Sequence, residues 1–265
     1  MSTYVMSDLH GCFEEFQQML DLIKFNPEKD RLIIAGDIID RGPDNYKMLK
    51  YAESKPESVQ FILGNHDEDF KEYCEGIEYL YTSKRYKGRV TGILKCPFFS
   101  MTVQDQYSTV MDLLLDDPVT KTDFLNWKKM FESFPYYLKL RVNKKDYIVV
   151  HAGYITNSEF KQFHWQNPWS YLKTRETFNI WAREESLTYG GLADTTIVFG
   201  HTPTIFEDSK FFNNGKVWYN GRDDGCRFFN IDCGLVYGKT YPNEIKNANL
   251  ACIRLEDEKI FYLYN

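Results

Sequence analysis

Apolar and polar positions along the first 65 residues alternate between strand-like and helix-like spacing. Short apolar runs at residues 3–6, 32–35 and 59–63 predict three strands. One-sided apolar spacing predicts a helix over residues 13–24, and a second helix is expected near residues 44–53. Strands that alternate with helices in this order predict a parallel sheet with right-handed crossovers.

The rest of the chain shows a different pattern. Residues 68 to about 133 are expected to be mostly helical, because Val110, Leu113 and Leu114 recur at helix spacing. Strand-like runs resume at residues 136–141, 147–150, 196–199 and 227–231, and a hairpin is expected over 250–255 and 259–263. We therefore expect one layered α/β domain over residues 1–265, with a mostly helical insertion at about residues 68–135.

Composition and charge narrow the class of protein. Hydrophobic residues make up 43% and charged residues 26% of the 265 residues, which is typical of a globular protein in water. The net charge of −6 and the lack of a Lys/Arg cluster argue against partners such as nucleic acid or an anionic membrane. No signal peptide or membrane-length apolar run is visible, and the six cysteines form no CxxC pair. We therefore expect free thiols and a cytoplasmic location.

Side chains of the kind that bind metals follow five of the predicted strands. In open α/β sheets, ligands collect at the carboxyl ends of strands. Any single Gly-Asp or Gly-His pair could be an ordinary turn, but five such blocks together favour a functional site. The residues that follow the five strands are Asp8 and His10, Asp37 and Asp40, Asn65 to Asp67, His151, and His201.

These donors fit a centre for two metal ions. Mixed imidazole and carboxylate ligands suit first-row divalent ions, with manganese expected first and iron, zinc or nickel as alternatives. Asp37 is placed to bridge the two ions. Asp8 and His10 would complete one site, while the other would be completed by Asn65, His151 and His201.

The five blocks resemble those of the calcineurin-like metallophosphoesterases, and specifically the PPP branch of serine/threonine protein phosphatases with its bacterial and phage relatives. That branch carries GDxHG, GDxxDRG, GNH[ED], H[AG]G and GHT, which resemble residues 7–11, 36–42, 64–67, 151–153 and 200–202. Residues 180–183 and 231–234 also resemble segments of bacterial members, so the resemblance covers almost the whole chain. The departures are Ser7 for Gly, Cys233 for Thr, and Asp67 where eukaryotic protein phosphatases have Glu.

The resemblance implies a fold and a mechanism. The fold would be a sandwich of two mixed β-sheets flanked by helices. Hydroxide bridging the two ions would attack phosphorus, as in other two-metal sites. His66 matches the family's general acid, and Asp40 matches the residue that orients it. Arg41, Arg183 and Asn65 match groups that bind the substrate phosphate.

Three functions are weighed on this basis. The leading interpretation is a serine/threonine protein phosphatase that acts on a phosphorylated protein, which residues 36–42 and Arg183 favour. The closest alternative is a symmetrical dinucleoside polyphosphate hydrolase acting on a nucleotide, because that family shares all five blocks and usually carries Asp at the position of Asp67. A non-catalytic scaffold is disfavoured because His66 and all six ligands are present. In the insertion, aromatic residues could stack on a nucleobase or fill a core: Tyr73, Tyr79, Tyr81 and Tyr86.

Overall fold

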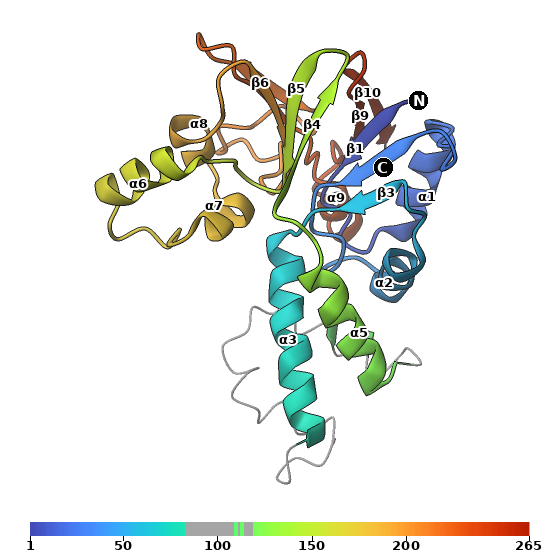
Figure 1. Cartoon of the computed structure of the whole chain (residues 1–265). Coiled ribbons are helices and arrows are strands. Elements are labelled where there is room, and N and C mark those ends of the chain that lie inside the picture. The colour runs from blue at the N-terminus through green and yellow to red at the C-terminus, as the bar shows by residue number, and fades with distance from the viewer. Residues whose placement is uncertain (83–108, 111, 114–118, 265) are drawn as a thin grey trace.

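Two five-stranded sheets pack face to face in the computed structural model, which describes residues 1–82, 109–110, 112–113 and 119–264 (Figure 1). The first sheet has the order β10-β9-β1-β2-β3. Its strands are β1 (Thr3–Met6), β2 (Arg31–Ile34), β3 (Val59–Phe61), β9 (Asn249–Arg254) and β10 (Lys259–Tyr264). The second has the order β4-β5-β6-β8-β7. Its strands are β4 (Tyr137–Val142), β5 (Lys145–Val150), β6 (Thr195–Phe199), β7 (Trp218–Gly221) and β8 (Arg227–Asn230).

Both sheets are mixed. β1, β2 and β3 run parallel, whereas β9 is antiparallel to β1 and to β10. In the second sheet β5, β6 and β8 run parallel, and the edge strands β4 and β7 are antiparallel to their neighbours. The expected class, two mixed sheets packed as a sandwich and flanked by helices, is therefore confirmed.

Alternate residues of the central strands face different hydrophobic layers. In β1, Val5 packs between the sheets, while Tyr4 and Met6 pack against helices on the outer face. In β5, Val149 packs between the sheets, and its neighbour Ile148 packs on the opposite face. Strands covered on both faces need apolar residues at every position, which explains why these strands read as continuous apolar runs.

Helices cover both outer faces. α1 (Phe13–Leu22), α2 (Asn45–Ser54) and α9 (Leu235–Thr240) contribute buried residues to the layer outside the first sheet. α6 (Asn157–Gln166), α7 (Arg175–Trp181) and α8 (Glu185–Tyr189) lie beside the second sheet (Figure 1). Among the described residues, no helix is both long enough and apolar enough to cross a bilayer.

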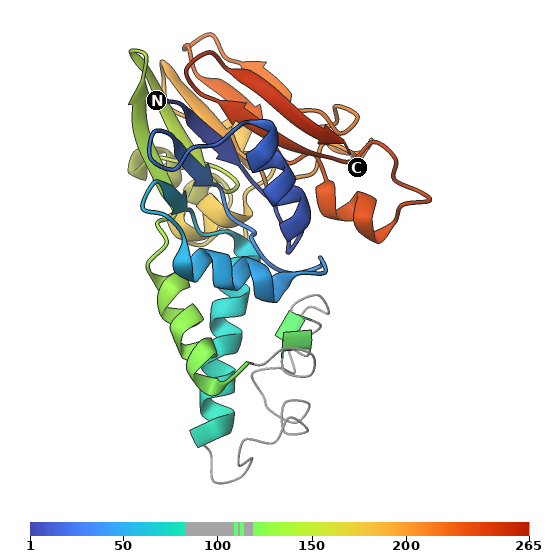
Figure 2. The same ribbon diagram turned by 90° about the vertical axis from the view of Figure 1, so that its right-hand side faces the viewer.

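α3 (Asn65–Thr82) and α5 (Lys121–Glu132) form a helical pair that projects from the sandwich, as both views show (Figure 2). Aromatic rings join the two helices; the centroids of Phe70 and Phe131 are 5.8 Å apart. Thr120 caps α5 in a reciprocal box with Asp123, which satisfies backbone donors at the helix start. The described residues of the predicted helical region lie mainly in α3 and α5, while the single domain and the extent of the insertion stay predictions.

Several details of the expected secondary structure differ from the observed elements. α1 ends at Leu22 rather than at residue 24, and β3 ends at Phe61 rather than at residue 63. The apolar periodicity does not predict α6, because Phe163 is its one buried residue. Its start is nevertheless marked in the sequence by the capping pair Thr156 and Glu159.

Of the aromatic residues expected to stack on a base or fill a core, Tyr73 is buried in the layer beneath the first sheet. The side chains of Tyr79, Tyr81 and Tyr86 lie outside the described part, as does the predicted helical position Leu114.

Candidate metal centre and active site

Loops at the carboxyl ends of strands from both sheets meet at one edge of the sandwich. β1, β2 and β3 supply residues from the first sheet, and β5 and β6 supply His151 and His201 from the second. Six site residues adopt the left-handed backbone conformation, with φ between +43° and +74°: Asp8, His10, Asp37, Asp40, Arg41 and His201. Such conformations cost about 1–3 kcal/mol each in residues other than glycine, and they cluster at functional sites.

Asp37 lies at the centre of the group. Its Oδ2 is 3.6 Å from Nε2 of His10 and 3.4 Å from Nε2 of His151. Within the described ranges, two groups of three potential ligands share Asp37, one with His10 and His66 and the other with His151 and His201. In each group the ligand atoms lie within 4.8 Å of one another. One carboxylate thus belongs to two adjoining groups, which is the arrangement that a bridging ligand requires.

Charge at this centre is balanced between the carboxylate and the imidazoles. Burial alone would raise the pKa of Asp37, but nearby imidazoles, chiefly those of His151 and His66, hold it well below its ordinary value. Conversely, burial alone would lower the pKa of His151, and the Asp37 carboxylate raises it instead. Asp37 is therefore an anion surrounded by nitrogen ligands, as a cation site needs.

Backbone carbonyls fix the orientation of two of these imidazoles. Nδ1 of His10 lies 2.9 Å from the carbonyl oxygen of Ile39, and Nδ1 of His151 lies 2.8 Å from that of Ala35. Because a carbonyl can only accept, each Nδ1 carries a proton, and Nε2 on the side of Asp37 is the atom through which the ring would bind a cation after losing its second proton. Metal-binding histidines are commonly held in this way.

The contacts of Asn65 and His201 show whether the site can hold a cation. The amide oxygen of Asn65 lies 2.9 Å from Nε2 of His151 and 2.8 Å from Nδ1 of His201. Nε2 of His201 is buried and has no hydrogen-bond partner in the described part of the chain. Leaving a buried polar atom unsatisfied costs about 1–3 kcal/mol, so this nitrogen is suited to a ligand from outside the chain. The residues present fit divalent metal ions.

Asp8 has a different environment from the other expected ligands. Both of its carboxylate oxygens lie 3.1 Å from the backbone nitrogen of His201, which donates to them. It belongs to neither potential ligand group of the described residues. Burial and the nearby carboxylate of Asp232 raise the pKa of Asp8 well above its ordinary value. Asp232, in the segment Ile231-Asp232-Cys233-Gly234, is therefore an acidic neighbour of Asp8.

His66 and Asp40 form a buried pair beside the first ligand group. Nδ1 of His66 lies 2.8 Å from Oδ2 of Asp40. Burial alone would lower the pKa of His66, but the carboxylates of Asp37 and Asp40 raise it above its ordinary value. A protonated imidazole at this position is able to donate a proton to a departing oxygen.

Asp67 is buried beneath the site rather than exposed to it. Its Oδ2 accepts hydrogen bonds from the backbone nitrogens of Asp37 and Gly64, both at 2.9 Å, and its Oδ1 accepts one from Ile38 at 3.0 Å. Asp67 therefore fixes the loop that carries Asp37. The Asp67 side chain does not line the cavity, so the presence of Asp rather than Glu here reflects packing beneath the site and does not distinguish the two enzymatic alternatives.

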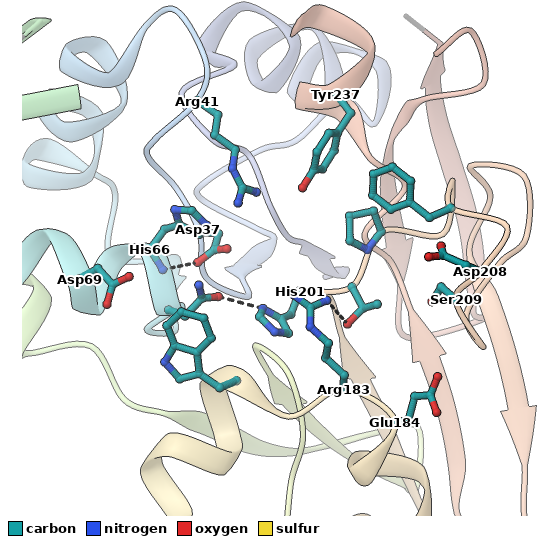
Figure 3. Close-up of a pocket in the computed structure, with 15 residues that line it drawn as sticks. Asp37, Arg41, His66, Asp69, Arg183, Glu184, His201, Asp208, Ser209 and Tyr237 are labelled. Carbon is teal, nitrogen blue, oxygen red and sulfur yellow. Dashed lines mark hydrogen bonds between the residues drawn. The ribbon is translucent and has the colours of Figure 1, made fainter. Parts of the chain in front are cut away.

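An open cavity of about 420 Å³ lies over Asp37, His66 and His201. Arg41 and Arg183 enter it from opposite sides (Figure 3). Nη1 of Arg41 lies 3.3 Å from Nε2 of His10, and Nη1 of Arg183 donates to the hydroxyl of Thr202 at 3.2 Å. Two exposed guanidiniums that converge on a metal group are arranged to bind phosphate oxygens.

The cavity also contains residues that the sequence did not single out. The Arg41 guanidinium lies over the ring of Tyr237, 5.5 Å from its centroid, and Phe206 packs edge-on against Tyr237 at 5.1 Å. Asp69 lines the cavity too, and burial raises its pKa to about 7. Tyr237 lies three residues after Gly234, the last residue of the segment 231–234 that resembles bacterial members. This closeness is the signal that could have located Tyr237.

The fold and the ligand set together define a metallophosphoesterase. The model of the calcineurin-like phosphoesterase family matches residues 1–238, and the chain belongs to that family. Proteins of this family use divalent metal ions, and the His/Asp groups around Asp37 are the residues available here to hold them.

Individual relatives match shorter segments. A symmetrical bis(5'-nucleosyl)-tetraphosphatase of Buchnera aphidicola subsp. Acyrthosiphon pisum (strain 5A) is 55% identical over 67 residues, 25% of this chain and 24% of the relative. One from Serratia proteamaculans (strain 568) is 37% identical over 97 residues, 37% and 33% of the two chains. The chain thus spans about a quarter to a third of the length of these curated relatives.

A crystal structure provisionally assigned to a diadenosine tetraphosphatase resembles the whole chain. Its TM-score is 0.56 at 15% identity, covering 100% of this chain and 93% of the other. At this identity the likeness establishes the fold.

Proposed function

We propose that the protein is a metal-dependent hydrolase of phosphoric esters and that its substrate is a dinucleoside polyphosphate. The observation that carries the hydrolase assignment is the position of Asp37 between Nε2 of His10 and Nε2 of His151, at 3.6 and 3.4 Å. The chemistry that two divalent cations supply at such a centre is polarisation of the phosphate and activation of water for in-line attack. Manganese is the ion that we propose, and the cytoplasm is the proposed location.

Side chains around Asp37 have distinct proposed roles. Arg41 and Arg183 bind non-bridging phosphate oxygens, with Asn65 beside them. His66 holds a proton on its imidazole and delivers it to the departing oxygen, while Asp40 keeps the ring oriented through the 2.8 Å contact to Nδ1. Asp8 accepts a hydrogen bond from the backbone nitrogen of His201 and so holds this residue of the second sheet in place.

The choice of substrate rests on the curated relatives, which are symmetrical bis(5'-nucleosyl)-tetraphosphatases. Two guanidiniums on opposite sides of the cavity suit a chain of several phosphates better than a single phosphate. The second candidate is a phosphoprotein, which residues 36–42 and Arg183 favour in the sequence and which the exposed side chain of Arg183 could reach.

The test compares diadenosine tetraphosphate with a phosphoserine peptide in the presence of manganese. We expect the dinucleotide to be converted to two molecules of ADP, and chelation of the metal to abolish turnover. Turnover of the peptide alone would overturn the proposed substrate. No turnover of either substrate or of p-nitrophenyl phosphate would overturn the hydrolase assignment and favour a scaffold.

A further inference from the structure

Exposed aromatic residues gather at the end of α6 and on the segment that joins α6 to α7. Trp165, Trp169 and Tyr171 are 81%, 94% and 57% exposed, within seven residues of one another. Large aromatic side chains that protrude together into solvent mark a binding surface more often than isolated ones do. The described structure gives these rings no covering element.

The segment that carries them is held firmly. Leu172 is fully buried in a small core with Phe163 and Phe178. The backbone nitrogen of Leu172 donates to Oγ of Ser170 at 3.1 Å, and Nζ of Lys173 donates to the carbonyl of Pro168 at 3.0 Å. The rings of Trp169 and Tyr171 are therefore presented by a fixed turn, which lowers the entropy lost on binding a flat ligand.

Tyr171 does not line the cavity itself but bonds to a residue that does. Its hydroxyl donates to the carbonyl oxygen of Trp181 at 3.1 Å. Trp181 lines the cavity, and its ring meets that of His201 edge-on at 6.0 Å. Burial and the Glu185 carboxylate raise the pKa of Tyr171, and the Arg183 guanidinium opposes that rise.

The side of the cavity around Arg41 also carries aromatic rings. Arg41 lies over Tyr237, and Phe206 packs against Tyr237. The hydroxyl of Tyr237 and the guanidinium of Arg41 point into the same space (Figure 3). Arg41 is thus accompanied by Tyr237 and Phe206, and Arg183 follows two residues after Trp181, to which Tyr171 bonds.

We propose that the substrate lies across the metal centre with one nucleoside on each aromatic wall, and that Tyr171 and Phe206 stack on its two bases. This inference rests on the proposed function and specifies how the substrate is recognised. Bases stack on aromatic side chains whatever their sequence. A compound with a charged phosphate chain and a flat ring at either end matches two cations flanked by two aromatic walls.

The test measures kcat/KM of the metal-loaded enzyme for diadenosine tetraphosphate and for p-nitrophenyl phosphate. For Tyr171→Ala and Phe206→Ala, we expect at least a fivefold loss with the dinucleotide, mostly through KM, and less than a twofold change with p-nitrophenyl phosphate. Tyr171→Phe keeps the ring and should retain most of the dinucleotide activity, which a purely structural role of the hydroxyl would not allow.

A matched control is available. Tyr219, 54% exposed on β7, does not line the cavity and packs against Phe229 of the second sheet, whereas Tyr171 bonds to the cavity residue Trp181, so Tyr219→Ala should leave both substrates unaffected. If the wild-type enzyme hydrolyses the dinucleotide but Tyr171→Ala and Phe206→Ala lower both substrates equally or neither, the inference fails and the proposed function stands. If the wild type hydrolyses p-nitrophenyl phosphate but not the dinucleotide, the proposed substrate fails and this inference with it.

Discussion

The imidazole of His66 and the carboxylate of Asp40 are joined by a buried hydrogen bond of 2.8 Å between Nδ1 and Oδ2. Asp40 is fully buried and His66 nearly so. His66 also belongs to a group of potential metal ligands with His10 and Asp37. The variants His66→Asn and Asp40→Asn distinguish a general acid from a metal ligand at the position of His66.

His66→Asn should keep the metal and lose the proton donor. We expect turnover of an alkyl phosphate to fall about 10²–10⁴-fold, because its leaving oxygen needs protonation. Turnover of p-nitrophenyl phosphate should fall much less, since its leaving group is stable as an anion. Metal content by mass spectrometry is the control, and its loss together with both activities would make His66 a ligand instead.

Asp40→Asn should change the pH dependence. Burial alone would lower the pKa of His66, and Asp40 is one of two carboxylates that raise it. A general acid must be protonated, so removing this charge should move the alkaline limb of kcat to lower pH. The measurement is a pH profile with an alkyl phosphate; an alkaline limb that stays in place would show that another group titrates.

Asp37→Asn should remove both ions together, because Asp37 is shared by the two groups of potential ligands. The measurement is metal stoichiometry after dialysis, beside the wild type. Asp21→Asn, an exposed change on α1, is the control. Retention of one tightly bound ion would contradict the bridging assignment.

Asp67→Asn should destabilise the loop that carries Asp37. The buried carboxylate accepts three backbone hydrogen bonds at 2.9–3.0 Å. An amide offers one acceptor oxygen and places a donor against a backbone donor. We expect a loss of at least about 2 kcal/mol in the free energy of unfolding, measured in urea. An unchanged midpoint would show that the loop is held by other contacts.

Glu258→Gln should weaken the sandwich in a pH-dependent way. This carboxylate, in the turn between β9 and β10, accepts from Arg227, Lys145 and Tyr147 of the second sheet at 2.7–3.0 Å. The hydrogen bond from Arg227, against the opposing effect of burial, lowers the pKa of Glu258 to about 2. Its stabilisation is therefore complete above the ordinary pKa near 4.5 and is lost as pH falls towards 2.

The expected cost of Glu258→Gln at pH 7 is about 1–3 kcal/mol, from urea unfolding. The difference from the wild type should shrink at pH 3. Glu57→Gln, at an exposed position, is the control and should have no effect at either pH. A difference that does not depend on pH would mean that packing, not charge, holds this turn.

Much of the fold could be predicted from local pattern. The central strands are continuous apolar runs, and the loops after them contain Gly, Asp and His. Both the strands and the candidate ligands could therefore be predicted. The contact between Asp8 and the backbone of His201 was not, because the two residues are 193 positions apart. Nothing in local spacing says which loop a carboxylate will face.

The stacking of Arg41 on Tyr237 was hidden for the same reason. α6 escaped prediction on different grounds, because a helix that buries one residue has no apolar stripe to detect. The capping pair at Thr156 and Glu159 was the available signal. Periodicity therefore reveals the elements that build the core, whereas elements that border the site depend on end signals and on tertiary contacts.

The candidate ligands come from both layers of the sandwich, with His10 and Asp37 on one and His151 and His201 on the other. Ions held between them would add a cross-link between the two sheets, beside the side-chain packing and the hydrogen bonds that already join them. A ligand that binds the native state alone raises its stability in proportion to the logarithm of its concentration. Metal supply would then govern how long the folded molecule survives heat and proteolysis, apart from any effect on turnover.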